Sequence, residues 1–366
     1  MAPWMHGVVA NPSGSHRASR IARRALEEAR DEVAAFVGAK PRDVIFTAGG
    51  TESCDLAIAG VANLHRQSHE STSIVVSSTE HHAVLDAAVK MARDFPSVSL
   101  RTIAVDADGV VDLDALRDAL TPDTAVVSVM TANNETGVRQ PLDAVSSTVH
   151  AFIPGGTVVH TDAVAAAPWL HLPTATSAVD LISICGHKIG GPVNSGALIL
   201  RRDVALDAVV PGGGQEGGRR GGTVDVAAAV GLAAATRATA RDLIEVNERV
   251  AGLQLRLATA LAFLPGAAVT APGASRLAGT VHVTFVGVAS DELLFLIDQA
   301  GVCASAASSC SSGAGEPSHV LSAMGVAPER ARGALRLTMG AETTPLEVDA
   351  VIAIVADAVH RLRAEV

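Results

Sequence analysis

The chain has 366 residues, of which 48% are hydrophobic and 18% charged, and its formal net charge is −10. This balance is typical of a folded protein long enough for two domains. Because only 2% of the residues are aromatic and the net charge is negative, the chain lacks the basic surface and stacking side chains that nucleic-acid binding requires. We therefore expect no direct nucleic-acid partner.

The apolar runs are too short to cross a membrane. The longest run, Val226 to Ala235, is well below the roughly 18 residues that span a bilayer. The start of the chain lacks a basic segment ahead of an apolar core, so no signal peptide is expected. The cysteines are too irregularly spaced for a disulfide framework or a CxxC metal site: they are Cys54, Cys185, Cys303 and Cys310. These features predict a cytoplasmic protein with free thiols and no membrane contact.

The first elements are a helix, a strand and a glycine turn. Apolar residues recur at helical spacing from Ser15 to Ala39, opposite an Arg/Glu face, which predicts an amphipathic helix. Asp43 to Thr47 reads as a short strand, and Gly50 and Thr51 follow just before a helix. A glycine turn between a strand and a helix directs free backbone N–H groups at an anion. A plain turn with no ligand is the alternative reading.

The chain then alternates between strands and helices. Strands are expected at Ile74–Ser77, Val98–Val105, Ala125–Met130, Thr157–Thr161, Val179–Cys185 and Ala197–Arg201, with helices at Ala83–Arg93, Leu113–Leu120 and Leu142–Phe152. This alternation predicts an α/β fold with a mostly parallel sheet covered on both faces. Ligands in such sheets bind at the carboxyl ends of the strands. Polar residues follow five of these strands: Thr51, His81 and His82, Asn133 and Asn134, Asp162, and Lys188.

The segment Ser183 to Gly191 places Lys188 just beyond a buried strand. We expect its amine to be partly desolvated there, and desolvation favours the neutral amine, which is a nucleophile. An ordinary surface lysine at a strand end is the alternative for Lys188 taken alone.

A glycine-rich segment, Pro211 to Thr223, predicts the domain boundary. We expect a large domain at 12–225 and a smaller α+β domain at 226–366, with residues 1–11 packing near the smaller one. The second part reads as a long helix at Val226–Leu264, a strand at Thr280–Val286, a helix at Asp291–Ala300, a helix at Pro317–Met324, a strand at Ala334–Met339 and a helix at Pro345–Glu365.

Motifs along nearly the whole chain resemble those of the cysteine desulfurase family, in the class V aminotransferase group of pyridoxal-phosphate enzymes with fold type I. They are Asn11–His16, Phe46–Ser53, Thr79–Val84, Asn133–Gly137, His160–Ala163, Gly186–Lys188, Gly212–Glu216, Arg219–Thr223, Ser308–Cys310, Glu316–Ser318 and Arg336–Thr338. The resemblance implies a homodimer that binds pyridoxal 5'-phosphate and converts L-cysteine to L-alanine. The sulfur would pass to an acceptor protein, in a pathway such as iron–sulfur cluster assembly.

The resemblance also implies roles for residues that would hold the cofactor. Lys188 would form the Schiff base and then act as the base, Asp162 would pair with the pyridine nitrogen, and His81 would stack on the ring. A helix cap is the alternative for His81, and His82 fits that plainer role better. The remaining cofactor contacts would come from Gly50, Thr51, Asn134, Cys185, His187 and, from a partner subunit, Thr223.

Two residues are implied to bind the substrate, and one to accept its sulfur. Arg336 would clamp the carboxylate with help from Asn11, because a guanidinium binds a carboxylate with two hydrogen bonds. A surface charge is the alternative for Arg336. Cys310 lies in a tract of small residues that predicts a mobile loop, from which a thiolate would take sulfur as a persulfide. We expect Cys303 to be a buried strand residue.

The chain departs from the family pattern at several positions. Ala165 replaces a glutamine, and Cys185 replaces a phosphate-binding serine, each change removing or weakening a hydrogen bond worth about 0.5–1.5 kcal/mol. Val193 and Asn194 replace a Lys-Gly pair, and Gly217 replaces an arginine. The family's opening strand and A-A-T-T segment are absent. Either the natural protein begins upstream of Met1, or one wall of the substrate pocket is supplied in another way.

These departures keep other functions open. A related enzyme on the same fold, such as a selenocysteine lyase, another β-lyase or an aminotransferase, is one alternative. A catalytically degenerate paralogue that acts as an interaction partner in sulfur transfer is another. A zinc site from His81, His82 and a cysteine is disfavoured, because adjacent histidines on a helix do not face one ion without strain.

Overall fold

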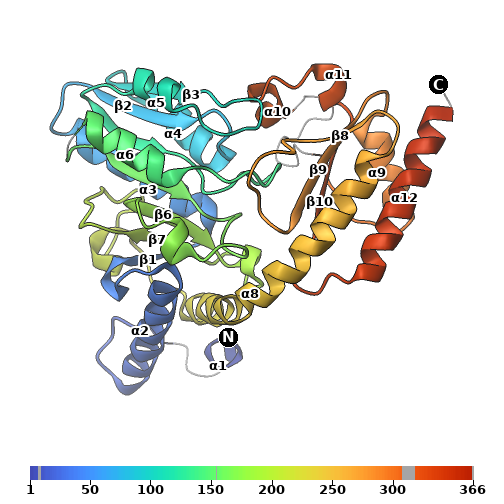
Figure 1. Ribbon diagram of the computed structural model, residues 1–366. Helices are drawn as coiled ribbons and strands as arrows, with labels where there is room; N and C mark the ends of the chain where they lie inside the picture. Colours follow the sequence, from blue (N-terminus) through green and yellow to red (C-terminus); the bar gives the residue numbers. More distant parts are fainter. Residues whose placement is uncertain (7–9, 154, 307–317, 365–366) are drawn as a thin grey trace. The chain divides into compact units, whose positions relative to one another are not determined.

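The computed structural model describes residues 1–6, 10–153, 155–306 and 318–364 (Figure 1). Contacts divide the chain into two compact units. The first comprises Met1–Ile103, Leu113–Thr131 and Pro141–Leu243, and the second comprises Ala104–Asp112, Ala132–Gln140 and Ile244–Val366. The division falls inside a long helix, α8 (Val226–Ala262), which contributes residues to both units.

In the described part of the first unit, seven strands form one sheet in the order β1-β7-β6-β5-β4-β2-β3. Their bounds are β1 (Val44–Thr47), β2 (Thr72–Ser77), β3 (Val98–Ile103), β4 (Thr124–Ser128), β5 (Val158–Asp162), β6 (Leu181–Cys185) and β7 (Gly196–Leu200). Only β7 runs against the others: it pairs antiparallel with both β6 and β1, and every other pairing is parallel. The predicted α/β class and mostly parallel sheet are confirmed.

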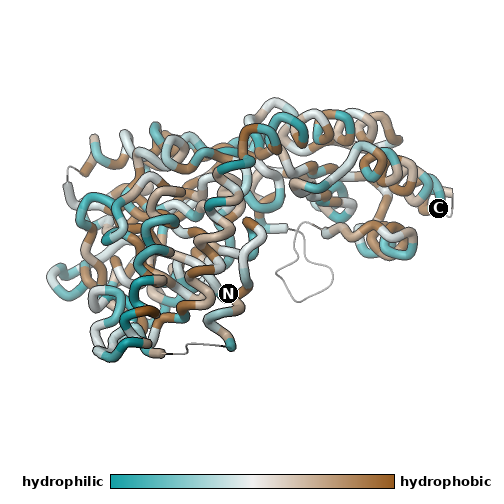
Figure 2. Tube along the Cα trace, turned by 90° about the horizontal axis from the view of Figure 1, so that it is seen from below, coloured by the Kyte–Doolittle hydropathy of each residue, from teal (hydrophilic) through white to brown (hydrophobic). Residues whose placement is uncertain are grey.

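Helices flank this sheet and bury its strands. They are α2 (Arg17–Val37), α3 (Gly50–Arg66), α4 (His82–Asp94), α5 (Leu113–Ala119), α6 (Leu142–Phe152) and α7 (Leu172–Ala175), with 3-10 turns η1 (Pro41–Asp43), η2 (His187–Ile189) and η3 (Gln215–Gly218). A short N-terminal helix, α1 (Ala2–His6), has no buried residues. Polar and apolar residues alternate along the helices (Figure 2). The expected amphipathic helix is α2, which begins and ends within two residues of its predicted bounds.

The helix that packs most widely on the sheet is α3, which contacts β1, β2 and β4 to β7. Small residues on α3, among them Ala57 and Ala62, are fully buried and let the helix lie close to the strands. The strands β2, β4, β6 and β7 are buried along their whole length. Such continuous burial explains their nearly unbroken runs of apolar residues.

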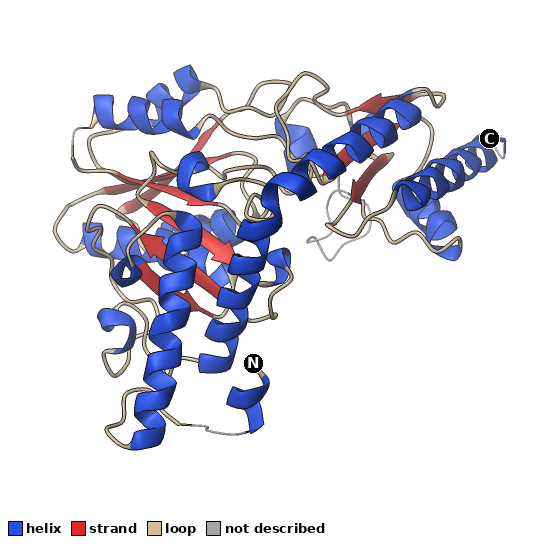
Figure 3. Ribbon diagram, turned by 60° about the horizontal axis from the view of Figure 1, so that its bottom comes forward, coloured by secondary structure: helices blue, strands red, loops and turns tan. Residues whose placement is uncertain are grey.

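The second unit has a smaller antiparallel sheet. In its described part, three strands follow the order β10-β9-β8, with bounds β8 (Ala267–Val269), β9 (Thr280–Phe285) and β10 (Ala334–Thr338). The accompanying helices are α9 (Ser290–Gln299), α10 (His319–Ala323), α11 (Pro328–Ala331) and α12 (Pro345–Ala364) (Figure 3). Among the described helices, none is both long and apolar enough to span a membrane.

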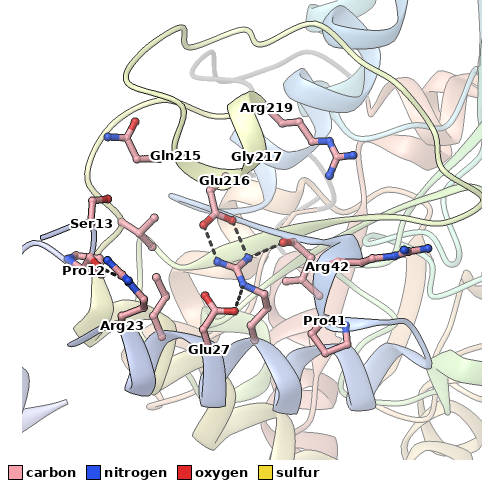
Figure 4. Close-up of a pocket in the computed structure, with 14 residues that line it drawn as sticks. Pro12, Ser13, Arg23, Glu27, Pro41, Arg42, Gln215, Glu216, Gly217 and Arg219 are labelled. Atoms are coloured by element: carbon pink, nitrogen blue, oxygen red, sulfur yellow. Dashed lines mark hydrogen bonds and ion pairs between the residues drawn. The ribbon is translucent and has the colours of Figure 1, made fainter. Parts of the chain in front are cut away.

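A buried ion pair holds the glycine-rich loop against α2 and β1. Glu216 accepts two hydrogen bonds from the Arg30 guanidinium, at 2.7 and 2.9 Å, and one from the Phe46 backbone N–H at 2.8 Å (Figure 4). The Glu216 side chain is 2% exposed. Burial opposes the charge on Arg30, but the hydrogen bonds and charge of Glu216 outweigh it, so the Arg30 pKa lies above its ordinary value. The pair therefore ties α2, β1 and the loop together.

We expect the Glu216→Ala variant to lose about 3 kcal/mol of unfolding free energy, because the buried Arg30 charge then has only the exposed Glu27, at 3.4 Å, as an ion-pair partner among the described residues. Chemical denaturation of the purified protein measures this loss. The matched control is Glu28→Ala, which removes an exposed α2 ion pair with Arg24 and should cost no more than about 1 kcal/mol. Equal losses in the two variants would contradict the structural role of Glu216.

Candidate active site

The parallel strands of the first unit bring several predicted site residues to one edge of the sheet. Asp162 is the last residue of β5, His81 follows β2, Lys188 follows β6, and Gly50 begins the helix after β1. The charges of Asp162 and Lys188 both act on His81. A Cβ atom built on Gly50 would lie 3.6 Å from the Cβ of Cys185. The four strand ends therefore form one polar cluster.

Asp162 is the buried acid of the cluster. Its side chain accepts a hydrogen bond of 2.8 Å from the Val164 backbone N–H. Burial raises its pKa, while that hydrogen bond and the charges of His81 and Lys188 favour the carboxylate form. The residue is thus a buried carboxyl group whose neighbours favour ionisation.

His81 is half-buried at the start of α4. Its Nδ1 accepts a hydrogen bond of 3.0 Å from the Ala83 backbone N–H, so His81 does cap the helix. In a neutral ring this leaves the proton on Nε2. The pKa of His81 is lowered, chiefly by burial. His82, by contrast, interacts with Asp86 at 3.3 Å on the more exposed side of the helix.

Lys188 lies in η2 and is exposed in the described chain. The prediction that burial would desolvate its amine is therefore wrong here, because the η2 turn carries the side chain away from the core that buries β6. The charge of Lys188 nevertheless acts on Asp162 and His81, so the residue belongs to the same cluster.

The start of α3 has the geometry of an anion site. Gly49 adopts φ of +151°, which L residues rarely adopt, and a Cβ on Gly196 would lie 2.7 Å from the Gly49 backbone. Glycine at both positions lets β7 pass directly beneath the turn. Thr51 is exposed, and the N–H groups of the first helical turn have no partner within the helix.

Cys185 ends β6 beside this turn and is fully buried. Burial raises the pKa of its thiol to about 11, although the backbone N–H groups of Lys188 and His187 bond to the sulfur. The sulfur lies 3.8 Å from Nε2 of His187. The thiol is therefore neutral near pH 7.

The glycine-rich loop also reaches the start of α3. Arg220 bonds Glu52 on the first turn at 2.7 Å. Thr223 is exposed a few residues further along the same segment.

In the second unit, Arg336 and Asn134 are brought together. Arg336 donates from Nη1 to the Asn134 carbonyl at 3.1 Å. Its neighbour across the antiparallel pair β9–β10 is His282, which is fully buried and bonds Thr270 through Nδ1 at 2.7 Å. Burial, together with the charges of Arg336 and Arg276, lowers the His282 pKa to about 3. The imidazole beneath Arg336 is thus neutral.

Three further residues named in the sequence analysis, Cys303, Cys310 and Asn11, are not part of the clusters described above. Cys303 is exposed and outside any strand, so the expectation of a buried strand residue is wrong: the chain leaves α9 through a turn before reaching it. Cys310 lies outside the described residues. Asn11 is exposed in the first unit, and its Oδ1 accepts a hydrogen bond from the Ser13 N–H at 2.9 Å.

Sequence reasoning missed the buried polar groups around Asp162. Glu80 is fully buried and bonds the Met130 N–H at 2.5 Å, and Cys54, His160 and Ser183 are also fully buried. Burial raises the pKa of Glu80 well above its ordinary value, and the charge of Asp162 adds to the shift. Glu80 and His160 lie in motifs that the sequence analysis names, Thr79–Val84 and His160–Ala163, but neither motif marks them as buried neighbours of Asp162. Among the described residues, no group of three His, Cys, Asp or Glu side chains is arranged to hold a metal.

A separate cavity of about 740 Å³ lies beside the Arg30–Glu216 pair. Its lining includes Arg23, Glu27, Arg42, Gln215 and Arg219 (Figure 4), and it contains neither Asp162 nor Lys188.

Comparison with known proteins shows the family of this chain. The model of the class-V aminotransferases matches residues 2–351. An IscS-like cysteine desulfurase of Mycobacterium tuberculosis is 42% identical over 97% of this chain and 91% of the relative. The cysteine desulfurase IscS of Methanosarcina thermophila is 36% identical over 99% of this chain and 88% of the relative.

Solved structures agree. A NifS-like protein superposes with a TM-score of 0.89 at 30% identity, covering 99% of this chain and 94% of the other. The DndA protein of Streptomyces lividans gives 0.78 at 31% identity, covering 92% and 94%. The chain belongs to the class-V aminotransferase family, and the resemblance drawn from its motifs is confirmed.

We expect Cys303 to react fastest among the described cysteines when the native protein is treated with a thiol reagent near pH 8. Cys185 and Cys54 are buried, and burial raises both thiol pKa values, so little thiolate forms. Peptide mass spectrometry after timed labelling measures the order, and unfolded protein is the control in which all three react. Rapid native labelling of Cys185 would contradict its burial.

Proposed function

We propose that this protein is a cysteine desulfurase that converts L-cysteine to L-alanine and carries the sulfur as a persulfide on Cys310. The observation that carries the proposal is the grouping of Asp162, His81 and Lys188 at one sheet edge. The supporting comparison is the 42% identity to an IscS-like cysteine desulfurase. We also propose a cytoplasmic homodimer with domains at 12–225 and 226–366.

The residues of the cluster fit pyridoxal 5'-phosphate. The buried Asp162 carboxylate suits a protonated pyridine nitrogen, and the free N–H groups at Gly50 and Thr51 suit a phosphate. Lys188 supplies the amine that the cofactor aldehyde requires. When bound, the cofactor accepts electrons from the substrate Cα.

Other residues would complete the cofactor site. His81 would face the ring, with its proton on Nε2 in the neutral form, since Nδ1 accepts from the Ala83 N–H. Cys185, His187 and Asn134 would add polar contacts, and Thr223 would reach the phosphate of the partner subunit in the dimer.

The substrate is held through its carboxylate and loses its sulfur to a thiol. Arg336 would bind the carboxylate bidentately, assisted by Asn11, while Lys188 would move the Cα proton. The Cys310 thiolate would attack the substrate sulfur, so that the C–S bond breaks and an S–S bond forms. Overall, cysteine and a thiol give alanine and a persulfide, and an acceptor protein would then take the outer sulfur.

A second candidate is a catalytically degenerate paralogue that acts as an interaction partner in sulfur transfer. Ala165 and the neutral, buried Cys185 thiol favour it, because both stand where the related enzymes would offer hydrogen bonds to the cofactor. An absorbance spectrum with and without L-cysteine separates the two. A protein with no visible band, even after addition of the cofactor, supports the degenerate paralogue.

We expect Lys188→Ala to abolish the visible absorbance band of the cofactor-loaded protein, because the other two lysines of the sequence, Lys40 and Lys90, lie before β1 and within α4 rather than at the strand ends that form the cluster. The matched control, Lys90→Ala, removes an exposed α4 lysine and should leave the band unchanged. Spectra of the two purified variants after addition of the cofactor make the measurement. A normal band in Lys188→Ala would assign the cofactor to another residue.

We expect Cys310→Ser to retain the visible band and to lose persulfide and sulfide release by at least about 100-fold, since a hydroxyl does not replace the nucleophilic thiolate. Alanine and sulfide are quantified after addition of L-cysteine. Cys303→Ser is the control and should keep wild-type rates. Release of sulfur by Cys310→Ser at the wild-type rate would overturn the persulfide route.

A further inference from the structure

The backbone on both sides of Thr223 is held by the rest of the first unit. Gly221 is buried, and its backbone N–H donates to the Val210 carbonyl at 2.7 Å. A Cβ atom on Gly221 would lie 2.6 Å from the Cα of Gly212, so the two ends of the glycine-rich loop meet backbone to backbone. Val224 is buried directly after Thr223. Thr223 is therefore an exposed residue on a segment that is anchored before and after it.

An ion pair attaches the same segment to the start of α3. Arg220 donates from Nε to one carboxylate oxygen of Glu52 at 2.7 Å and from Nη2 to the other at 3.3 Å. The side chains of both residues are 22% exposed. Two parallel hydrogen bonds of this kind fix direction as well as distance, which a single contact between exposed side chains does not.

Glu52 is itself held by the turn that precedes α3. The carboxylate oxygen that meets Nη2 of Arg220 also accepts a hydrogen bond of 2.6 Å from the Ala48 backbone N–H. Glu52 lies in the first turn of α3, where the positive end of the helix dipole favours a carboxylate. The pair thus connects the glycine-rich loop to the turn that forms the candidate anion site.

The position of Arg220 limits where Thr223 lies. Three residues of extended chain span at most about 11 Å, so a fixed Arg220 keeps Thr223 close to the start of α3 in its own subunit. The proposed function assigns Thr223 to the phosphate of the partner subunit. In a homodimer with twofold symmetry, each subunit lends this residue to the other. A group that fixes the segment in one subunit would therefore affect the cofactor site of the other.

We propose that Glu52 and Arg220 are positioning residues that hold Thr223 for the phosphate site of the partner subunit. The inference rests on the proposed function, because it takes the dimer and the role of Thr223 from it. Both residues act through Thr223 rather than on the cofactor. Loss of the pair leaves Thr223 on a segment with more conformations, so that binding has to order it before its hydroxyl meets the phosphate.

The first experiment tests the attachment in the cofactor-free protein. Hydrogen-exchange mass spectrometry follows the backbone N–H groups of residues 219–223, among them that of Gly222, which donates to the Gln215 side chain at 3.1 Å. We expect Glu52→Gln to speed exchange in this segment by about tenfold, because glutamine forms no ion pair with Arg220.

The matched control for exchange is Glu28→Gln, which removes the exposed ion pair with Arg24 on α2. It should leave the exchange of residues 219–223 unchanged. The same exchange rate in Glu52→Gln and in the wild type overturns the attachment. This result holds whether or not the protein binds the cofactor.

The second experiment locates the effect in the partner subunit. Heterodimers are built from two differently tagged copies, one of which carries Lys188→Ala, so the visible band reports only on the other copy, the reporter. When the Lys188→Ala copy also carries Glu52→Gln, we expect the dissociation constant of pyridoxal 5'-phosphate at the reporter to rise about fivefold. When Glu52→Gln lies in the reporter instead, the constant should rise no more than about twofold, because glutamine keeps an acceptor oxygen for the Ala48 N–H.

Thr223→Ala sets the upper limit of the effect on the partner. In the Lys188→Ala copy, it should raise the dissociation constant at the reporter about tenfold, because the hydroxyl is lost outright. Addition of Glu52→Gln to that copy should raise the constant no further, since both changes act through one contact. A further rise shows that Glu52 acts by another route and overturns its positioning role.

The outcomes separate this inference from the proposed function. A wild-type protein that binds no cofactor overturns the proposed function, and hydrogen exchange then judges the attachment alone. A wild type that binds the cofactor, with a rise only when Glu52→Gln lies in the reporter or with no rise at all, overturns the positioning role and leaves the proposed function intact. If Glu52→Gln does not fold, Arg220→Gln replaces it, and the same outcomes apply.

Discussion

The structure depends on burying one carboxyl group in the sheet among neighbours that favour its ionised form. Asp162 is buried at the end of β5, and burial disfavours its charged form. The Val164 N–H, the thiol of Cys54, and the charges of His81 and Lys188 together oppose that cost. These groups come from α3, from the residues that follow β2 and β6, and from the end of β5 itself. A change in strand order or register would therefore remove several of them at once.

Strand direction explains why these groups meet. β1, β2, β5 and β6 all end at the same edge, so one residue after each strand is enough to build the cluster. β7 runs the other way between β1 and β6 and begins where they end. Its first residue, Gly196, meets the Gly49 turn so closely that a Cβ there would lie 2.7 Å from the Gly49 backbone, whereas Gly49 itself is favoured as glycine by its φ of +151°. The candidate anion site at the start of α3 thus depends on β7, which runs antiparallel between β1 and β6 and begins directly against the Gly49 turn.

Residues at strand ends could be predicted from the sequence, and residues inside the core could not. Lys188, Asp162 and His81 interrupt apolar runs, which gives them a visible pattern. Cys54 and Ser183 are small residues within a helix and a strand, where the sequence pattern does not distinguish them from ordinary core residues, and nothing in the His160–Ala163 motif shows that His160 is buried between two serines. Short elements such as β8 and α7 have too few residues to show a period, and tertiary packing forms them. The exposure of Lys188 and Cys303 depends on turns whose path no local pattern specifies.

Cys185, in place of the family's serine, would change which groups hydrogen-bond the phosphate in the proposed cofactor site. A serine hydroxyl there would donate to an anion at the start of α3, whereas a thiol is a weak donor. Its neutrality prevents repulsion of a phosphate, and its sulfur is already bonded by the backbone N–H groups of Lys188 and His187. In the proposed cofactor site, the N–H groups from Gly50 onward would then carry more of the phosphate contact. Such contacts depend on backbone geometry rather than on side-chain identity, so the site tolerates the thiol as long as the Gly49 turn is kept.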